Sequence, residues 1–390
     1  MAQTASAEKR LTVVTILGTR PELIKLSRVI AELDQHTTHV LVHSGQNYDY
    51  ELNQVFFDEL EIRAPDHFLD VAAPTAAETI AQVISRSDTL LRKLRPDAVL
   101  FYGDTNTCLA AIAAKRLQLP VFHMEAGNRC FDARVPEEIN RKIVDHISDI
   151  NMTITEHARR YLLAEGLRPE TVFKVGSSMK EVLKYYDEKI QKSAILKTLS
   201  LEPQRYFVVS SHREENVDVP RNRERLIHSL RRLREEFGHE IVVSTHPRTR
   251  KQFEDHDLSA VPGIRFLKPL GFVDYIALQK AAFCVLSDSG TLTEESALLK
   301  FPAVMFREAH ERPEGMDVGT LIMSGLDPER VVDSVSVVTA QARTHPSAPD
   351  TVPDYEAADV SRRVVRIILS YTSYVRRTVW HDPSHETPSD

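Results

Sequence analysis

Short apolar segments alternate with amphipathic segments along most of the chain, and this alternation restricts the fold more than any other feature. Residues 11–17, 97–102 and 120–124 are rich in β-branched and aromatic side chains, as is typical of strands buried on both faces. Amphipathic segments with capping residues follow these runs. Strands that alternate with helices predict a parallel sheet covered by helices on both faces. We therefore expect an α/β fold of doubly wound, Rossmann-like sheets.

The strand–helix pattern restarts near residue 205, which predicts a second domain. A chain of 390 residues exceeds the roughly 250–300 residues at which single cores stop growing. We expect two lobes with an interdomain cleft, and an amphipathic C-terminal helix that packs across both. The predicted segments are a disordered lead-in (1–10), an N-terminal domain (11–177), a C-terminal domain (178–357), the C-terminal helix (358–380) and a disordered tail (381–390).

Composition excludes several classes of function. The net charge of −7 argues against a general nucleic-acid binder. No apolar run approaches the roughly 18 residues of a membrane-spanning helix, and the first residues lack the apolar core of a signal peptide. The cysteines, Cys108, Cys130 and Cys284, are odd in number and lack metal-ligand spacing. We therefore expect a cytoplasmic protein that has no disulfide framework and no metal site.

Acidic residues follow two successive predicted strands and begin the next predicted helix. Asp104 follows Gly103, Glu125 precedes Gly127, and Glu137 comes directly after Pro136. Because open α/β sheets bind ligands beyond the carboxyl ends of their strands, these acids are expected at one crevice. Helix capping is the alternative explanation. It accounts well for Asp104 but poorly for Glu125, which stands before a glycine and not at a helix cap.

The first predicted strand ends in a glycine loop that leads into a helix. Residues 18–25 read GTRPELIK, with Arg20 and Lys25 in the loop and first turn. A helix N-terminus beside two cations is typical of an anion site, although both could be ordinary surface cations. The segment matches neither the dinucleotide fingerprint nor the P-loop. We therefore expect no redox cofactor.

A second phosphate site is predicted in the C-terminal domain. Ser289, Gly290 and Thr291 end a strand and begin a helix, so their amides and hydroxyls are suited to phosphate oxygens. Glu295 lies one turn further and is a candidate ligand for a ribose diol. The alternative for Glu295 is a favourable interaction with the helix dipole.

Two further strand ends contribute basic residues. His212 and Arg213 follow the strand at 205–211 and are candidates for a second phosphate. His246 precedes a proline after the next strand and is a weaker candidate, because a lone loop histidine is more often structural or exposed.

Eight segments, taken together and in order, resemble the non-hydrolysing UDP-N-acetylglucosamine 2-epimerase family. The resemblance covers roughly residues 11–375 and implies a glycosyltransferase-B-like fold whose C-terminal domain holds UDP. The segments are GTRPELIK (18–25), GDTNT (103–107), EAGNR (125–129), PEEINR (136–141), SHREEN (211–216), STHPR (244–248), SDSGT with the following EE (287–295) and ERPEG (311–315), which contains Arg312.

The resemblance implies an isomerase that needs no cofactor. A base removes the C2 proton of a UDP-N-acetylhexosamine, UDP leaves by anti elimination to give a 2-acetamidoglycal, and UDP adds back after protonation of the opposite face. Two faces of one carbon require two proton-transfer groups, and a departing diphosphate requires cations. By this resemblance Asp104, Glu125 and Glu137 are acid/base candidates, His212 assists the leaving phosphate and Glu295 binds ribose. UDP and the sugar nucleotide are the expected partners, and a homodimer is the expected assembly.

Several segments depart from the common bacterial pattern. HREEN replaces HRREN, so that Glu214 stands in place of an arginine, and SDSGT replaces SDSGG. In the segment GQNYDYEL, Gln46 is retained and Asp49 stands near the position of a second glutamine of the bacterial allosteric pocket. These variants resemble the branch that makes UDP-N-acetyl-L-fucosamine from UDP-2-acetamido-2,6-dideoxy-L-talose for capsule and O-antigen synthesis.

Three alternatives remain open from the sequence. A glycosyltransferase of the same fold would transfer the sugar to an acceptor, and the acid cluster argues against it. A hydrolysing epimerase would release free N-acetylmannosamine. A nucleotide-sugar-binding regulator would have lost catalysis, which the intact acids and His212 disfavour.

Overall fold

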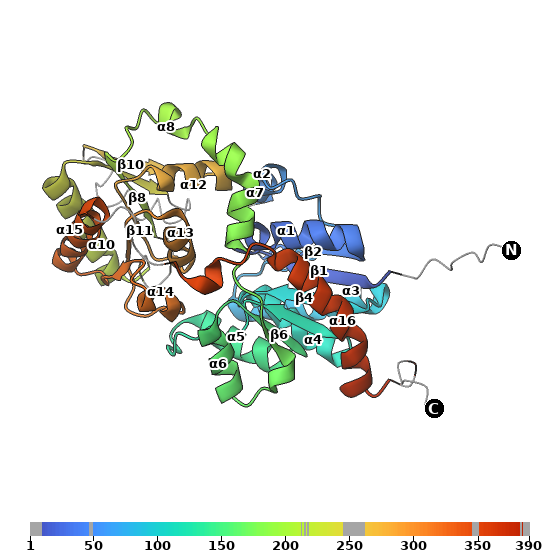
Figure 1. The fold of residues 1–390 in the computed structure, drawn as a ribbon. Coiled ribbons are helices and arrows are strands. Elements are labelled where there is room, and N and C mark those ends of the chain that lie inside the picture. The colour runs from blue at the N-terminus through green and yellow to red at the C-terminus, as the bar shows by residue number, and fades with distance from the viewer. Residues whose placement is uncertain are drawn as a thin grey trace. The chain divides into compact units, whose positions relative to one another are not determined.

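The chain divides into two compact units in the computed structural model (Figure 1). The N-terminal unit comprises Met1–Val182 and Ala357–Asp390, and the C-terminal unit is the continuous segment Leu183–Glu356. The described residues are 10–46, 50–211, 213, 216, 218–244, 262–344, 351–382 and 384.

The N-terminal unit contains a seven-stranded sheet in the order β3-β2-β1-β4-β5-β6-β7. Every neighbouring pair is parallel. Val, Ile, Leu and Phe side chains fill the central strands because both faces are covered. The strands are β1 (Thr12–Leu17), β2 (Thr38–His43), β3 (His67–Phe68), β4 (Ala98–Tyr102), β5 (Val121–Met124), β6 (Ile150–Thr153) and β7 (Val172–Lys174).

Helices connect the strands of this sheet and begin at the signals that the sequence carries. Pro21 stands in the first turn of α1, where its missing N–H costs no hydrogen bond. Thr75 caps α3 by accepting from the Glu78 amide, while Glu78 accepts from the Thr75 amide. The helices are α1 (Arg20–His36), α2 (Tyr50–Glu59), α3 (Ala76–Leu94), η1 (Asn106–Ala110), α4 (Ala111–Arg116), α5 (Pro136–Ile147), α6 (Glu156–Ala164) and η2 (Pro169–Thr171). Helix α7 (Met179–Gln191) follows β7, and the chain passes within it from the first unit to the second.

The last helix, α16 (Val360–Thr378), belongs to the N-terminal unit and packs against α1 (Figure 1, red beside blue). Near its end, Arg376 Nη2 lies 2.9 Å from Asp97 Oδ1. At its start, the Ser361 amide donates to Glu181 Oε2 at 3.0 Å. The Glu181 side chain therefore links the segment where the chain leaves this unit to the segment where it returns.

The C-terminal unit contains a six-stranded sheet in the order β10-β9-β8-β11-β12-β13, again parallel throughout. Its strands are β8 (Tyr206–Ser210), β9 (Glu240–Ser244), β10 (Ile264–Leu267), β11 (Cys284–Ser287), β12 (Ala303–Met305) and β13 (Ile322–Met323). Its helices are α8 (Ile195–Thr198), α10 (Pro220–Phe237), α12 (Phe272–Lys280), α13 (Thr291–Leu299), α14 (Pro313–Asp317), α15 (Pro328–Thr344) and η4 (Pro353–Tyr355).

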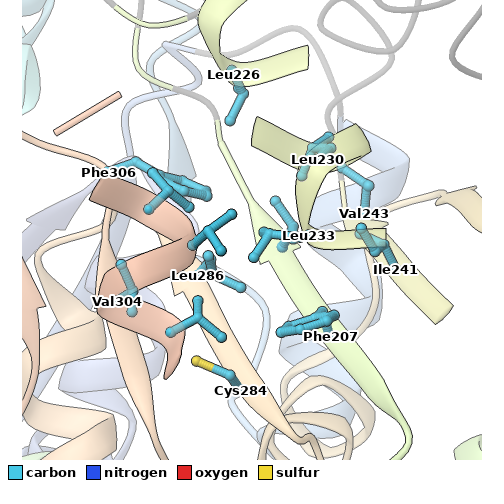
Figure 2. Packing of buried hydrophobic residues seen from close by; sticks show 14 of the residues in the cluster. Phe207, Leu226, Leu230, Leu233, Ile241, Val243, Cys284, Leu286, Val304 and Phe306 are labelled. Carbon is cyan, nitrogen blue, oxygen red and sulfur yellow. The ribbon is translucent and has the colours of Figure 1, made fainter. Parts of the chain in front are cut away.

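Alternate residues of each strand enter different layers of the C-terminal core. Phe207 of β8 packs in the cluster with α10 (Figure 2). Val209 of β8 and residues of α15 belong to the same cluster. Tyr206 and Val208, their neighbours in the same strand, pack in the cluster with α12 and α13. This period of two confirms a sheet that is covered by helices on both faces.

The predicted fold class of two parallel-sheet α/β domains is confirmed. The structure adds the two-residue strands β3 and β13, which are too short to give a periodic signal, and α15, which the sequence reasoning did not name. The helical segment after β4 begins as the 3₁₀ helix η1 and becomes α-helical at Ala111. Within the described ranges, no helix is both long and apolar enough to cross a membrane.

Candidate active site

Several candidate residues follow the strands at which each sheet changes its winding direction. In the N-terminal sheet β1 and β4 are neighbours; β2 and β3 extend from β1 on one side, and β5, β6 and β7 extend from β4 on the other. The pair β8 and β11 has the same position in the C-terminal sheet. The carboxyl ends of such a pair are where open α/β sheets bind ligands. The loop after β4 contains Asp104, and the loop after β11 contains Ser289.

The loop after β1 is packed closely around Gly18. A Cβ added to Gly18 would lie 2.0 Å from Ser44 Oγ and 2.5 Å from Thr107 Oγ1. Arg20 follows at the start of α1, and its guanidinium carbon lies 5.5 Å from the centre of the Phe56 ring. This packing brings the N-terminus of α1 beside the segment after β4.

Glu22, in the first turn of α1, joins the loops after β1 and β4. Its Oε2 accepts from the Gly18 amide at 2.5 Å and the Thr19 amide at 2.8 Å. Its Oε1 accepts from Thr105 Oγ1 at 2.7 Å. The pKa of Glu22 is raised to about 7, mainly because the side chain is buried; the three hydrogen bonds lower this pKa, and the nearby charge of Asp104 adds to the increase.

Glu125 occupies a strained backbone position at the end of β5. Its φ of +61° lies in the left-handed region, which costs a residue with a side chain of order 1 kcal/mol or more. Lys25 Nζ lies 3.3 Å from Glu125 Oε2, and the Tyr102 hydroxyl donates to the same oxygen. The structure therefore places Lys25, an expected phosphate ligand, against a candidate acid/base group.

Asp104 is held by a residue of the helix that follows the next strand. Arg141 of α5 contacts Asp104 Oδ2 through Nε at 3.0 Å and Nη2 at 2.6 Å. Asn140 Nδ2 donates to the Asp104 carbonyl oxygen at 3.0 Å. The Asp104 side chain stays 22% exposed, so it is positioned by α5 and still accessible.

The two glutamates that begin α5 have different surroundings. Glu138 is buried, pairs with Arg141 at 2.8 Å and accepts from the Cys130 amide at 3.0 Å. Burial opposes its ionisation, but these partners outweigh burial and lower its pKa. Glu137 is partly exposed, and its side chain has no hydrogen bond or ion pair within the part of the chain that the structure describes. Glu138 therefore holds local structure through its buried contacts, whereas the side chain of Glu137 is accessible.

A buried polar network supports the loops after β4 and β5. His123 of β5 has Nε2 2.7 Å from the Gly103 carbonyl oxygen and Nδ1 2.9 Å from Asp145 Oδ1. Asp145 also accepts from the Gly127 amide and from Arg129 Nη1. The sequence reasoning did not select His123 or Asp145. The available signal was a histidine inside an otherwise apolar strand.

In the C-terminal unit, Asp288 organises the loops after β8 and β11. It is fully buried, and its Oδ2 accepts from Ser211 Oγ at 2.8 Å, the Arg213 amide at 3.1 Å and Asn216 Nδ2 at 3.1 Å. Arg213 Nε also donates to the Asp288 carbonyl oxygen at 3.0 Å. Asp288 therefore links the loop after β11 to the loop after β8.

The predicted phosphate loop lies at the start of α13. Ser289 Oγ and Thr291 Oγ1 are 2.9 Å apart. A Cβ at Gly290 would lie 2.2 Å from Glu311 Oε1, so the loop passes close to this carboxylate. Because α13 begins with these residues, its first amides lie beside two hydroxyl groups, as the sequence predicts.

Glu295 and Arg312 have buried partners within the same unit. Gln279 Nε2 donates to Glu295 Oε2 at 2.7 Å. Arg312 Nη2 lies 3.0 Å from Glu294 Oε1, and both side chains are almost fully buried. Four residues of the sequence-based hypotheses lie outside the described residues: Asp49, His212, Glu214 and His246.

The comparison with known proteins decides the family. A family model described as UDP-N-acetylglucosamine 2-epimerase matches residues 31–369. The chain belongs to this family. A homologue of UDP-N-acetylglucosamine 2-epimerase from Methanococcus maripaludis is 35% identical over 342 residues, which cover 86% of this chain and 94% of the relative. The sequence-based assignment to the non-hydrolysing epimerase family is confirmed, and the protein is an isomerase.

Solved structures of the family share the fold over nearly the whole chain. The UDP-N-acetylglucosamine 2-epimerase of Rickettsia bellii has 57% identity and a TM-score of 0.90, and the match covers 96% of this chain and 100% of that one. The Methanocaldococcus jannaschii epimerase, in complex with UDP-GlcNAc and UDP, has 31% identity and a TM-score of 0.86, with 92% and 100% covered. A glycosyltransferase from Rickettsia africae, at 10% identity and a TM-score of 0.54, shares the fold alone.

Family membership does not select one sugar. One relative, from Pseudomonas aeruginosa, is described as a UDP-2,3-diacetamido-2,3-dideoxy-D-glucuronate 2-epimerase and is 32% identical over 330 residues, which cover 83% of this chain and 91% of the relative. The branch that acts on 6-deoxy-L-talose stays a prediction from the sequence.

Proposed function

We propose that this protein interconverts a UDP-N-acetylhexosamine and its C2 epimer without hydrolysing the sugar–phosphate bond. The observation that carries the proposal is the register of β4 and β5. Tyr102 pairs with Met124 at the ends of these parallel strands. Asp104 and Glu125 follow those two residues, so they extend from adjacent strand ends of one sheet. Two carboxylates from neighbouring loops supply the proton-transfer groups that inversion at one carbon requires.

The proposed reaction is an elimination followed by a re-addition. A carboxylate takes the C2 proton, the C2–H electron pair forms a C1–C2 double bond, and the C1–O bond breaks with its electron pair leaving on UDP. A second acid then delivers a proton to the other face of C2 while UDP rebonds to C1. We assign these proton transfers to Asp104, Glu125 and Glu137. No electrons are gained or lost, so the reaction needs no redox cofactor.

Cations and helix-end amides are proposed to stabilise the departing diphosphate. Arg20 begins α1. Arg213, in the loop after β8, donates a hydrogen bond to the carbonyl oxygen of Asp288. We assign the leaving phosphate to these two residues together with His212. Lys25 contacts Glu125, and its positive charge favours the ionised carboxylate of that base. This second role for Lys25 is part of the proposal.

The C-terminal unit is proposed to hold UDP. Ser289, Gly290 and Thr291 at the start of α13 are assigned to phosphate oxygens, and Glu295 to the ribose hydroxyls. Gln279 holds one carboxylate oxygen of Glu295, so the side chain is already oriented. Arg312 and His246 remain proposed ligands of the nucleotide sugar. Support comes from relatives described in complex with UDP-GlcNAc and UDP or with UDP-GlcNAc alone.

Two substrate pairs are proposed for the activity, UDP-GlcNAc/UDP-ManNAc and UDP-2-acetamido-2,6-dideoxy-L-talose/UDP-N-acetyl-L-fucosamine. Relatives described as UDP-N-acetylglucosamine 2-epimerases support the first pair. The HREEN and GQNYDYEL variants support the second. A cytoplasmic homodimer that serves capsule or O-antigen synthesis is likewise a prediction from the sequence.

Deuterium incorporation at C2 tests this function. Each UDP-sugar is incubated with the protein in D₂O, and ¹H NMR follows loss of the C2 proton, appearance of the epimer and release of free sugar. We expect exchange and epimerisation with at least one of the two pairs. Asp104→Asn and Glu125→Gln are each expected to lower turnover roughly 10²-fold or more, whereas Asp88→Asn, on the surface of α3, is the matched control. Free N-acetylmannosamine as the main product, or no exchange with either pair, would exclude the proposal.

A further inference from the structure

Glu22 makes one more contact than a glutamate in the first turn of a helix usually makes. A glutamate in the first turn commonly accepts from the capping residue, as Glu78 does at the exposed start of α3. Glu22 makes that contact through Oε2 and uses Oε1 for Thr105, 83 residues further along the chain. It is also 2% exposed. One buried carboxylate therefore spans the two loops at the point where the N-terminal sheet changes direction.

The two ends of this bridge are next to residues assigned to the reaction. Thr19 directly precedes Arg20, and Thr105 directly follows Asp104. Lys25, in the second turn of the same helix, contacts Glu125. The Glu22–Thr105 hydrogen bond is therefore a direct side-chain link between the start of α1 and the loop that contains Asp104.

Burial explains why such a contact matters energetically. A buried carboxylate with unmet hydrogen-bonding capacity is costly, so removal of Thr105 Oγ1 favours a shift of one loop relative to the other. Asp104 Oδ2 and its carbonyl oxygen are both held from α5, so the loop after β4 is fixed on that side. The loop after β1 would therefore move, and Arg20 with it.

We propose that Glu22 is a positioning residue that fixes the spacing between the phosphate-binding start of α1 and the Asp104 loop through its hydrogen bond to Thr105. This inference rests on the proposed epimerase function. Small displacements of catalytic groups, on the order of 1 Å, cost up to roughly 10²-fold in rate. Loss of the bridge should therefore lower kcat more than it raises KM.

A double-mutant cycle tests the bridge from both ends. Thr105→Val keeps the size of the side chain and removes the hydroxyl, Glu22→Ala removes the carboxylate, and Thr105→Ser restores the donor. We expect each of the first two variants to lower kcat roughly 10-fold or more, with a smaller change in KM. The kcat of the double variant should be no lower than that of the less active single variant. Thr105→Ser should retain most of the wild-type kcat.

Glu78→Ala is the matched control, because Glu78 has the same capping position on α3 but is exposed and joins no second loop. It should leave kcat and KM unchanged. Losses in kcat that multiply in the double variant, or wild-type kcat in Thr105→Val, would overturn the bridge. Glu22→Gln, whose amide retains both an acceptor and a donor, guards against failure of the alanine variant to fold. An inactive wild-type protein would instead count against the proposed function and is distinguishable from all of these outcomes.

Discussion

The left-handed backbone of Gly127 offers a measurable test of how the Glu125 loop is held. Gly127 has φ +82°, and a Cβ added there would lie 2.4 Å from the carbonyl oxygen of Ala158 in α6. That atom belongs to a helix backbone and cannot rotate away. The Gly127 amide also donates to the buried carboxylate of Asp145. Gly127→Ala must therefore either move α6 or pull this loop off Asp145.

The expected loss of stability has two parts. Alanine in the left-handed region costs about 1 kcal/mol, and forcing a side chain into packed space costs typically about 1–3 kcal/mol more. Gly166 is the matched control, since it has φ +91° and nothing within 4 Å of an added Cβ. Gly166→Ala should therefore lose only about 1 kcal/mol, and Gly127→Ala about 3 kcal/mol.

Urea unfolding followed by far-UV circular dichroism measures both variants in the same unit of the protein. The difference between their midpoints reports the steric part, because the backbone cost is common to both. Equal midpoints for Gly127→Ala and Gly166→Ala would refute the reasoning. Turnover should also fall in Gly127→Ala, because Glu125 lies two residues before the displaced backbone.

Three further predictions concern titration, nucleotide binding and regulation. The pKa of Glu22 is raised from 4.5 to about 7. The stabilisation that Glu22 provides is therefore fully present below about pH 4.5 and is lost as the pH rises through 7. Relative to Glu22→Gln, the wild type should lose about 3 kcal/mol of unfolding free energy over this range, and parallel pH–stability curves would refute this. Glu295→Ala should weaken UDP binding in calorimetry while leaving C2 proton exchange at saturating substrate nearly unchanged; unchanged UDP affinity would remove the ribose role. By the resemblance described above, Glu214 replaces the second arginine of the HRREN pattern, so we expect hyperbolic kinetics without activation by added UDP-GlcNAc. Sigmoidal curves would contradict this.

The sheets were predictable because their signal is local. Each buried strand is a run of apolar side chains such as AVLFY in β4, and each turn into a helix is marked by glycine, proline or a capping residue. The order of the strands was not predicted, because β4 returns to lie beside β1 and not beside β3. Strand β13 pairs only two residues with β12, so no run of sequence identifies it. Its place is decided by tertiary packing.

The candidate site was predictable as far as it depends on strand ends. Asp104 and Glu125 follow β4 and β5 as expected, and the Ser289 loop begins α13. Glu22 and His123 were missed because their roles arise from partners far away in sequence, such as Thr105 and Gly103. The same long-range pairing separates Glu137 from Glu138, two identical residue types of which only one faces Arg141.

The packing of α16 on α1 has a consequence for the order in which the molecule is made. On the ribosome the first and last helices of the N-terminal unit emerge at opposite ends of synthesis, with the whole C-terminal unit between them. Domains generally fold as units as they emerge, so the C-terminal unit can be complete while the first unit still lacks a helix. Val364, Val365 and Ile368 of α16 are almost fully buried, so the surface that they cover stays exposed until α16 has been synthesised. Nascent chains stalled before residue 360 should therefore engage chaperones through an α1 surface that the finished protein covers.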